Sequence, residues 1–270
     1  MTKRLLSSPL TFLLSSVLLL LASPRPEAVS IDDGFGAVEG VSTLAAALRN
    51  TQALKSAFAR FNATAATTPA HEPREVVIPA GHTYRIVHTM LVQLRNVKFI
   101  ILGTLELHDD NFHVWPQSRY YNAGLFFSRC VNLTLSGSDN DGASGSRGVG
   151  LIDGLGFRWW EAAVYNAVTP RAKGWRDNRP NIINVVGSTD VVIERITLRN
   201  APAFHVHTSN TLRQVVRYVT VHVDTHRQFA LKRRWTEETS AGRLALESAR
   251  EVAAAATAAA VAAGAAADPK

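Results

Sequence analysis

The chain has a single cysteine, Cys130, among its 270 residues, and this scarcity excludes a disulfide framework within the chain. Cys130 is then a buried thiol or pairs with a cysteine outside this sequence. Cysteine and histidine form no cluster with the spacing of a metal site, and no nucleophile elbow is present. Helix-turn-helix and zinc-finger patterns are missing too, and the basic residues are dispersed, which argues against nucleic acid. We expect no metal ion and no cofactor.

Long apolar runs are also scarce, and the longest is too short to span a bilayer. Leu10 to Ala22 is about 13 residues long, whereas a hydrocarbon core needs roughly 20. The run follows Lys3 and Arg4, which is the layout of a secretory signal peptide. We therefore expect residues 1–28 to be a signal peptide and the protein to reach the extracellular space or cell wall without a stable membrane span. A signal anchor that is never cleaved is the alternative.

Glycosylation patterns and charge agree with export. The tripeptides that begin at Asn62 and Asn132 fit the N-glycosylation acceptor pattern, which has physical meaning only in the secretory pathway. The formal charge is +7, and removal of residues 1–28 leaves about +5. A mildly basic, secreted and monomeric protein is suited to an acidic polysaccharide as its partner.

One amphipathic helix precedes a series of short strands. Apolar residues recur at helical spacing from Ser42 to Phe61, with Ser42 as a plausible N-cap. The period then changes to that of short β-rich runs bounded by Gly, Asn, Asp, Pro or Ser. These runs cover residues 76–78, 97–102, 104–107, 131–135, 182–186, 191–198 and 215–223.

The strand runs recur at a spacing that is typical of solenoids. Equivalent runs are separated by about 20–25 residues, and each starts with a polar residue followed by alternating apolar positions. No long helices separate them, so a doubly wound α/β fold fits poorly. The pattern favours an all-β coil of parallel strands over residues 29–226, with the first helix capping its N-terminal end. An antiparallel sandwich is the alternative.

Residues 227–270 differ in composition from the strand region. A basic stretch that ends at Arg234 precedes a segment dominated by alanine, the best helix former. We expect Thr236 to Ala263 to be helical where ordered, with little apolar surface to hold it on a core.

The stretch from Gly150 to Trp160 is the richest in glycine and aromatic residues. Its glycines suit tight corners and close backbone approach. Trp159 and Trp160 either offer stacking surfaces to sugar rings or pack into the core. Asp153 is a possible catalyst, but an Asp between Ile and Gly more often caps a turn.

The same stretch resembles the G-x-I-D-G-x-G-x-x-W-W signature of the polygalacturonase family of glycoside hydrolases. Further similar segments occur in the family's order: residues 35–37, 50–54, 77–81, 103–105, 179–180 and 199–206. Together they cover about residues 31–224. The resemblance implies a right-handed parallel β-helix of the pectin lyase type, an open cleft for polygalacturonan and hydrolysis with inversion.

The catalytic motifs of that family are not found in this chain. Inversion needs one carboxylic acid and a second carboxylate roughly 6.5–9.5 Å away. The family supplies them from an N-T-D element and a D-D pair, followed by G-H-G and R-I-K segments. After Val223 this chain continues into the basic and alanine-rich segment instead. We therefore expect no catalytic residue in the chain and an inactive or incomplete form of the enzyme.

Other candidate residues give weaker signals. Asp109 and Asp110 precede the level of the expected active site, and the calcium-loop-like sequence at residues 139–142 lacks the Glu at its twelfth position. His205 and His207 alternate along a strand and should share a face. The resemblance makes His207, with Trp160, a candidate sugar contact. A non-catalytic polysaccharide-binding β-helix and a pectate lyase-type enzyme are the alternative functions.

Overall fold

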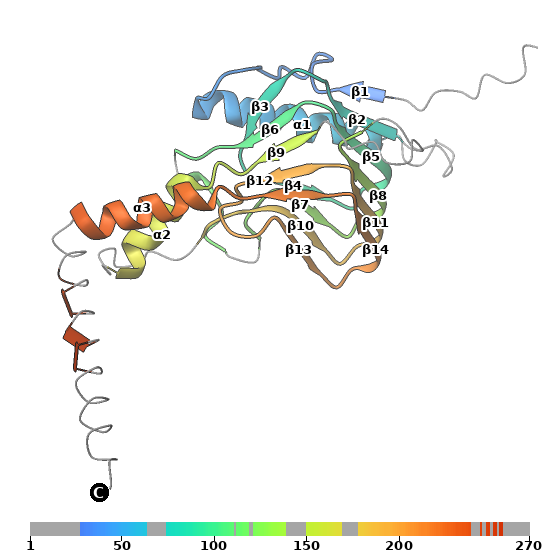
Figure 1. The fold of residues 1–270 in the computed structure, drawn as a ribbon. Coiled ribbons are helices and arrows are strands. Elements are labelled where there is room, and N and C mark those ends of the chain that lie inside the picture. Colours follow the sequence, from blue (N-terminus) through green and yellow to red (C-terminus); the bar gives the residue numbers. More distant parts are fainter. Residues whose placement is uncertain are drawn as a thin grey trace, which may run out of the picture.

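Parallel strands stacked in successive coils form the body of the protein in a computed structural model (Figure 1). The structure describes residues 28–63, 74–110, 112–118, 121–138, 150–168 and 178–238, and residues 244, 247, 248, 251, 252, 254 and 255. The predicted signal peptide, apart from Ala28, lies outside the described residues.

The strands belong to three sheets. In order of pairing, sheet A contains β1 (Ala28–Ser30), β2 (Arg74–Ile78), β5 (Arg95–Ile101), β8 (Val131–Ser136), β11 (Thr189–Glu194) and β14 (Leu212–Arg217). Sheet B contains β15 (Thr220–His222), β12 (Thr197–Arg199), β9 (Leu151–Asp153), β6 (Thr104–Leu107) and β3 (Thr83–Ile86). Sheet C contains β13 (Val206–Ser209), β10 (Asn181–Val186), β7 (Ala123–Ser128) and β4 (Thr89–Val92).

Every pairing between these strands is parallel. The chain passes from sheet A to sheet B to sheet C and returns to sheet A one coil further on. The predicted parallel β-helix is therefore confirmed, and the antiparallel sandwich is excluded.

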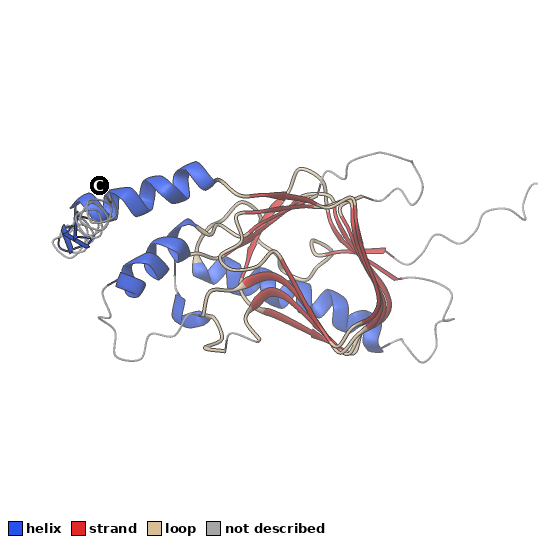
Figure 2. Ribbon diagram, turned by 60° about the horizontal axis from the view of Figure 1, so that its bottom comes forward, coloured by secondary structure: helices blue, strands red, loops and turns tan. Residues whose placement is uncertain are grey.

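The register between coils builds the core as columns of apolar side chains. Val76, Phe99, Leu135 and Ile193 occupy equivalent positions on four neighbouring strands of sheet A, and each is at most 1% exposed. Burial of a side chain of this size contributes about 1.5–3 kcal/mol. Figure 2 shows the strands of the three sheets surrounding this common interior.

Helix α1 (Leu44–Ala63) caps the N-terminal end of the coil, as predicted. It packs against β2, β3 and β4, and its side chains Leu54, Phe58 and Phe61 are almost completely buried. The N-cap is Thr43, whose hydroxyl accepts a hydrogen bond from the Ala46 N–H at 3.3 Å, rather than the predicted Ser42.

Three further helices with defined bounds in the described ranges lie outside the coil. They are η1 (Phe112–Val114), α2 (Phe157–Val168) and α3 (Thr225–Glu238). Helix α3 begins earlier than the predicted Thr236, because the Asp224 carboxylate accepts a hydrogen bond from the Arg227 N–H at 2.9 Å and so caps it. It packs against α2, with the Arg227 guanidinium 3.6 Å from the centre of the Phe157 ring. No helix in the described part of the chain is long and apolar enough to cross a membrane.

The remaining sequence features have defined places in this fold. Cys130 is a buried free thiol, and burial raises its pKa. Asn132 is exposed at a corner of the coil, where its amide donates a hydrogen bond to the Asn96 side-chain oxygen at 3.0 Å. Asn62 belongs to α1, and Thr64 lies outside the described residues. Glycosylation of both asparagines stays a prediction.

We predict that Asn50→Ala lowers the free energy of unfolding by about 2 kcal/mol, because it leaves buried polar groups unpaired. The fully buried Asn50 amide joins α1 to two segments: it accepts from the Val38 N–H at 2.6 Å and donates to the Val38 and Arg85 carbonyl oxygens at 3.0 Å. Urea unfolding measures the change. Gln52→Ala, at an exposed position of the same helix, is the control and should stay within about 0.5 kcal/mol. Equal effects of the two substitutions would contradict the prediction.

Candidate functional site

Four side chains form a row on the outer face of sheet C. Met90, Phe126, Asn184 and His207 occupy equivalent register positions on β4, β7, β10 and β13. The neighbouring positions on these strands, such as Leu125 and Ile183, point into the core, so the four side chains lie outside it. Strands lie about 4.8 Å apart, which makes this outer row roughly 14 Å long.

The middle of the outer row is held firmly by its neighbours. Phe126 is 2% exposed and packs beside His88 and Tyr121, with ring centres 6.1 Å and 5.7 Å away. The Asn184 side-chain oxygen accepts a hydrogen bond from the Asn181 amide at 2.8 Å. Packing and hydrogen bonding thus fix these two side chains before any ligand arrives.

The ends of the outer row are more accessible. Met90 is 43% exposed, and the half-buried His207 lies beside Phe204, with ring centres 6.4 Å apart. Phe204 is 53% exposed and Tyr121 is 54% exposed. The Nδ1 atom of His207 is shielded and has no hydrogen-bond partner in the described structure. Aromatic side chains and the half-buried imidazole of His207 therefore lie together at this surface.

The two other histidines near the row are neutral at neutral pH. Burial lowers the pKa of His88, whose Nδ1–H donates to the Ala123 carbonyl oxygen at 2.8 Å. Burial also lowers the pKa of His205, whose Nε2 accepts from the Ala201 N–H at 3.5 Å. His205 is therefore engaged with the backbone through Nε2, whereas Nδ1 of His207 is buried without a hydrogen-bond partner in the described structure.

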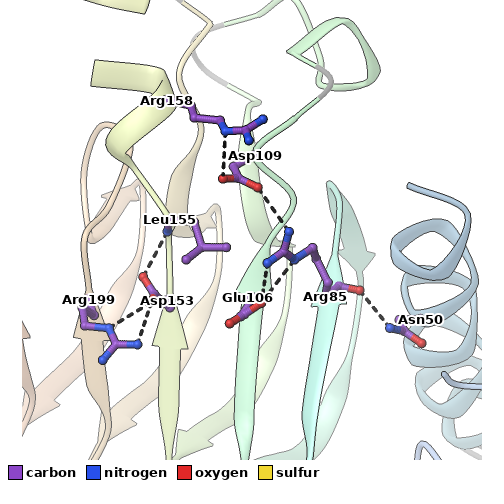
Figure 3. Close-up of polar contacts among 8 residues, drawn as sticks. All are labelled: Asn50, Arg85, Glu106, Asp109, Asp153, Leu155, Arg158 and Arg199. Atoms are coloured by element: carbon purple, nitrogen blue, oxygen red, sulfur yellow. Dashed lines mark hydrogen bonds and ion pairs between the residues drawn. The ribbon is translucent and has the colours of Figure 1, made fainter. Parts of the chain in front are cut away.

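The candidate carboxylates lie on a different sheet and pair with arginines. Figure 3 shows this network on the outer face of sheet B, where Arg85 binds Glu106 at 2.8 Å and Asp109 at 3.2 Å. Arg158 lies 3.8 Å from Asp109 and also pairs with Asp110. These contacts join β3, β6 and α2. In this structure Asp109 and Asp110 therefore act as ion-pair partners that connect these elements.

Asp153 is also committed to the fold. It is 3% exposed, and its carboxylate accepts hydrogen bonds from Arg199 at 2.7 and 2.9 Å and from the Leu155 N–H at 3.0 Å (Figure 3). The glycines that follow are required by close approach, since a Cβ at Gly154 or Gly156 would come 2.6 Å from the Asn200 carbonyl oxygen. The motif thus locks β9 to β12.

Both tryptophans of the motif belong to α2 rather than to an extended segment. Trp159 is 2% exposed and packs against Phe112 at 4.2 Å and Trp115 at 6.1 Å between ring centres. Trp160 is 5% exposed, and its indole N–H donates to the Ala201 carbonyl oxygen at 3.1 Å. In this conformation the Trp160 ring packs inside the protein.

The described residues contain no group of three or more His, Cys, Asp or Glu side chains that could hold a metal ion. The calcium-loop-like residues 139–142 lie outside the described ranges. The outer row itself was missed by sequence reasoning except for His207. Its one sequence signal is Asn184, a polar residue inside the apolar strand β10.

Comparison with known proteins connects part of the chain to polygalacturonases. No protein-family model matches the chain. It is 39% identical over 111 residues to a polygalacturonase of Chamaecyparis obtusa, a match that covers 41% of this chain and 18% of that protein. It is 28% identical over 108 residues to a polygalacturonase of Juniperus ashei, covering 40% and 18%. The chain thus spans less than a fifth of the length of these relatives.

Solved structures share the fold. An exopolygalacturonase from Thermotoga maritima superposes with a TM-score of 0.53 and 16% identity, over 74% of this chain and 48% of that one. A protein from Parabacteroides merdae described as a glycosyl hydrolase gives a TM-score of 0.54 and 18% identity, over 73% and 77%.

We predict that Asp153→Asn lowers the free energy of unfolding by about 1–2 kcal/mol, because Arg199 loses its ionic partner while its partly exposed side chain keeps some hydration. Thermal or urea unfolding measures this. The matched control is Asp190→Asn. It breaks the exposed pair of Asp190 on β11 with Arg213 on β14, both in sheet A, and should leave the unfolding midpoint nearly unchanged. A midpoint that is insensitive to Asp153→Asn would show that this carboxylate is free for another role.

Proposed function

We propose that this chain, which is polygalacturonase-like by sequence and by fold, binds an acidic pectin-like polysaccharide along the outer row of sheet C. The observation that carries the proposal is the register of Met90, Phe126, Asn184 and His207. An extended polymer that runs along the coil axis would meet the exposed Met90 and the half-buried His207 at the two ends of the row, and the exposed Tyr121 beside the buried Phe126.

The chemistry of the outer row suits a sugar acid. Tyr121 and Phe204 expose aromatic surface on which the apolar face of a sugar ring can pack. The half-buried His207 supplies a polar group beside this aromatic surface, and polar groups among apolar surface are what orient a ligand. The positive net charge, +7 for the full sequence and about +5 without residues 1–28, attracts a polyanion over a longer range.

His207 is the stronger of the two predicted sugar contacts. Its half-buried ring lies beside the exposed Phe204, so its accessible edge can meet a ligand without first breaking a hydrogen bond at Nδ1. Trp160 would first have to break its hydrogen bond to Ala201 and leave the ring of Phe157, 5.1 Å away. We therefore assign Trp160 at most an indirect contribution through the position of Ala201.

Binding, rather than hydrolysis, is the part of the family's activity that we assign to this chain. Inversion requires two carboxylates with water between them. Asp153 is bound to Arg199, and Asp224 caps α3. Asp109 and Asp110 pair with Arg85 and Arg158. We place the binding function outside the cell or in the cell wall, carried out by a monomer.

Substitution of His207 tests the proposed surface. His207→Ala should weaken binding of oligogalacturonate about tenfold, the loss expected from one hydrogen bond and its packing. Isothermal titration calorimetry measures the affinity. His222→Ala, an exposed histidine on sheet B, is the control and should bind as the unchanged chain does. Unchanged affinity after His207→Ala, or an equal loss in the control, would move the site elsewhere.

The same protein should release reducing ends from polygalacturonate very slowly. Loss of a positioned general acid or base lowers a rate about 10²–10⁴-fold, and the carboxylates considered above are engaged in structural contacts. Reducing-sugar release by purified, mass-verified protein measures this. Robust turnover that disappears in Asp153→Asn or Asp224→Asn would establish an enzyme and refute the assignment of binding alone.

A further inference from the structure

The last coil of the described chain has free strand edges. Strands β13, β14 and β15 each stand at the end of their sheet and pair on one side only among the described strands (Figure 1). We call the outer edges of these three strands the end surface. Free edges of parallel strands present unpaired N–H and C=O groups that can accept a further strand.

The core is open at the end surface. Val216 continues the column of Ile193 and is 49% exposed, whereas Ile193 is 1% exposed. Val221 continues the column of Leu198 and is 55% exposed, whereas Leu198 is fully buried. Tyr218 is 66% exposed. The positions of Val216 and Val221 are buried in every earlier coil, and they are half exposed here because no described coil follows.

Helix α3 does not cover this surface. The chain leaves β15 and enters α3, which packs on α2 and runs away from the strands beside it (Figures 1 and 2). At the opposite end of the coil α1 packs against β2, β3 and β4, so the two ends of the described coil differ.

The edge of β14 carries two arginines that already recognise carboxylates from a parallel strand. Arg213 binds Asp190 of β11 at 2.5 and 2.6 Å, and Arg217 binds Glu194 of the same strand at 2.7 Å. Both side chains remain largely exposed, at 68% and 53%. A guanidinium has five N–H donors, and these bonds use two and one of them. Each arginine can therefore bind a second carboxylate from the free side.

We propose that the end surface docks a polypeptide strand that carries two carboxylates at the register positions of Asp190 and Glu194. Such a strand would pair with the free edge of β14, cover Val216 and place one carboxylate beside each arginine. Main-chain pairing would supply affinity, and the two ion pairs would fix the register.

Charge favours this occupant over a second copy of the chain. Two copies that met through their end surfaces would bring the same arginines together, since a two-fold interface joins identical patches. A second copy offering its other end would present α1 and the three-residue edge strand β1, whose residues Ala28–Ser30 carry no carboxylate. An acidic strand satisfies both the free edge and the free arginine donors.

A peptide with the sequence of residues 181–199 is a suitable probe. It contains the sequence of β10, β11 and β12, and its Asp190 and Glu194 have the spacing that Arg213 and Arg217 bind within the protein. Fluorescence anisotropy of the labelled peptide with the full chain should show saturable binding. The same peptide with Asp190→Lys and Glu194→Lys should bind about tenfold more weakly, because two attractions become repulsions.

A charge swap provides the second arm. The R213E/R217E chain should prefer the lysine peptide, a reversal that a merely hydrophobic surface would not produce. If that chain does not fold, the comparison of the two peptides on the unchanged chain decides the matter. Equal binding of both peptides, or no saturable binding, would overturn the proposal. Self-association of the chain in analytical ultracentrifugation that the acidic peptide does not reverse would also overturn it, in favour of a second copy.

Discussion

The parallel register between successive coils determines where the side chains of this protein lie. Each residue on a strand stacks on the residue in register one coil earlier, so both face the same interior or the same outer surface. An apolar residue that is in register with an apolar residue extends a core column, as Ile193 does above Leu135. A charged residue in register with an opposite charge extends an ion-pair ladder, as Arg217 does beside Glu194. One geometric rule therefore produces the core, the polar ladders and the outer row.

The corners between sheets C and A obey the same rule at the level of the backbone. Asn96, Asn132, Asp190 and Arg213 are in equivalent positions, and their φ angles are 53°, 54°, 56° and 50°. This left-handed conformation is tolerated best by Asn and Asp among residues with a side chain. The repeated polar residue before each strand run is thus a conformational requirement of the corner. Asn132 is exposed at this corner, so its side chain is accessible as a predicted glycosylation acceptor while its backbone adopts the turn conformation.

The fold could be predicted from the sequence because the stacking of coils makes the pattern of apolar and polar residues repeat along the chain. Short apolar runs at intervals of about 20–25 residues, closed by polar corners, predict stacked parallel strands. The signature from Gly150 to Trp160 also proved to be a packing motif. Gly154 and Gly156 permit close approach to Asn200, and Asp153 holds Arg199. These residues make packing contacts, so a family resemblance that rests on them predicts the fold better than it predicts catalytic activity.

The site was much less accessible for a physical reason. Phe126 and Asn184 are neighbours only through the register of β7 and β10. That register depends on the lengths of the connecting loops, which do not repeat along the sequence. The sequence analysis did not predict helix α2, whose residues Trp159 and Trp160 make tertiary contacts with Phe112 and with the Ala201 carbonyl oxygen. Local sequence patterns do not contain those contacts.

The outer row and the end surface meet at β13. His207 lies on the edge strand of sheet C, so the side chain that we propose to contact sugar stands in the coil with the fewest neighbours. Regions with few buried contacts open most readily. A strand docked on the edge of β14 would bury more of this last described coil and would thereby restrict the motion of the segment that carries His207.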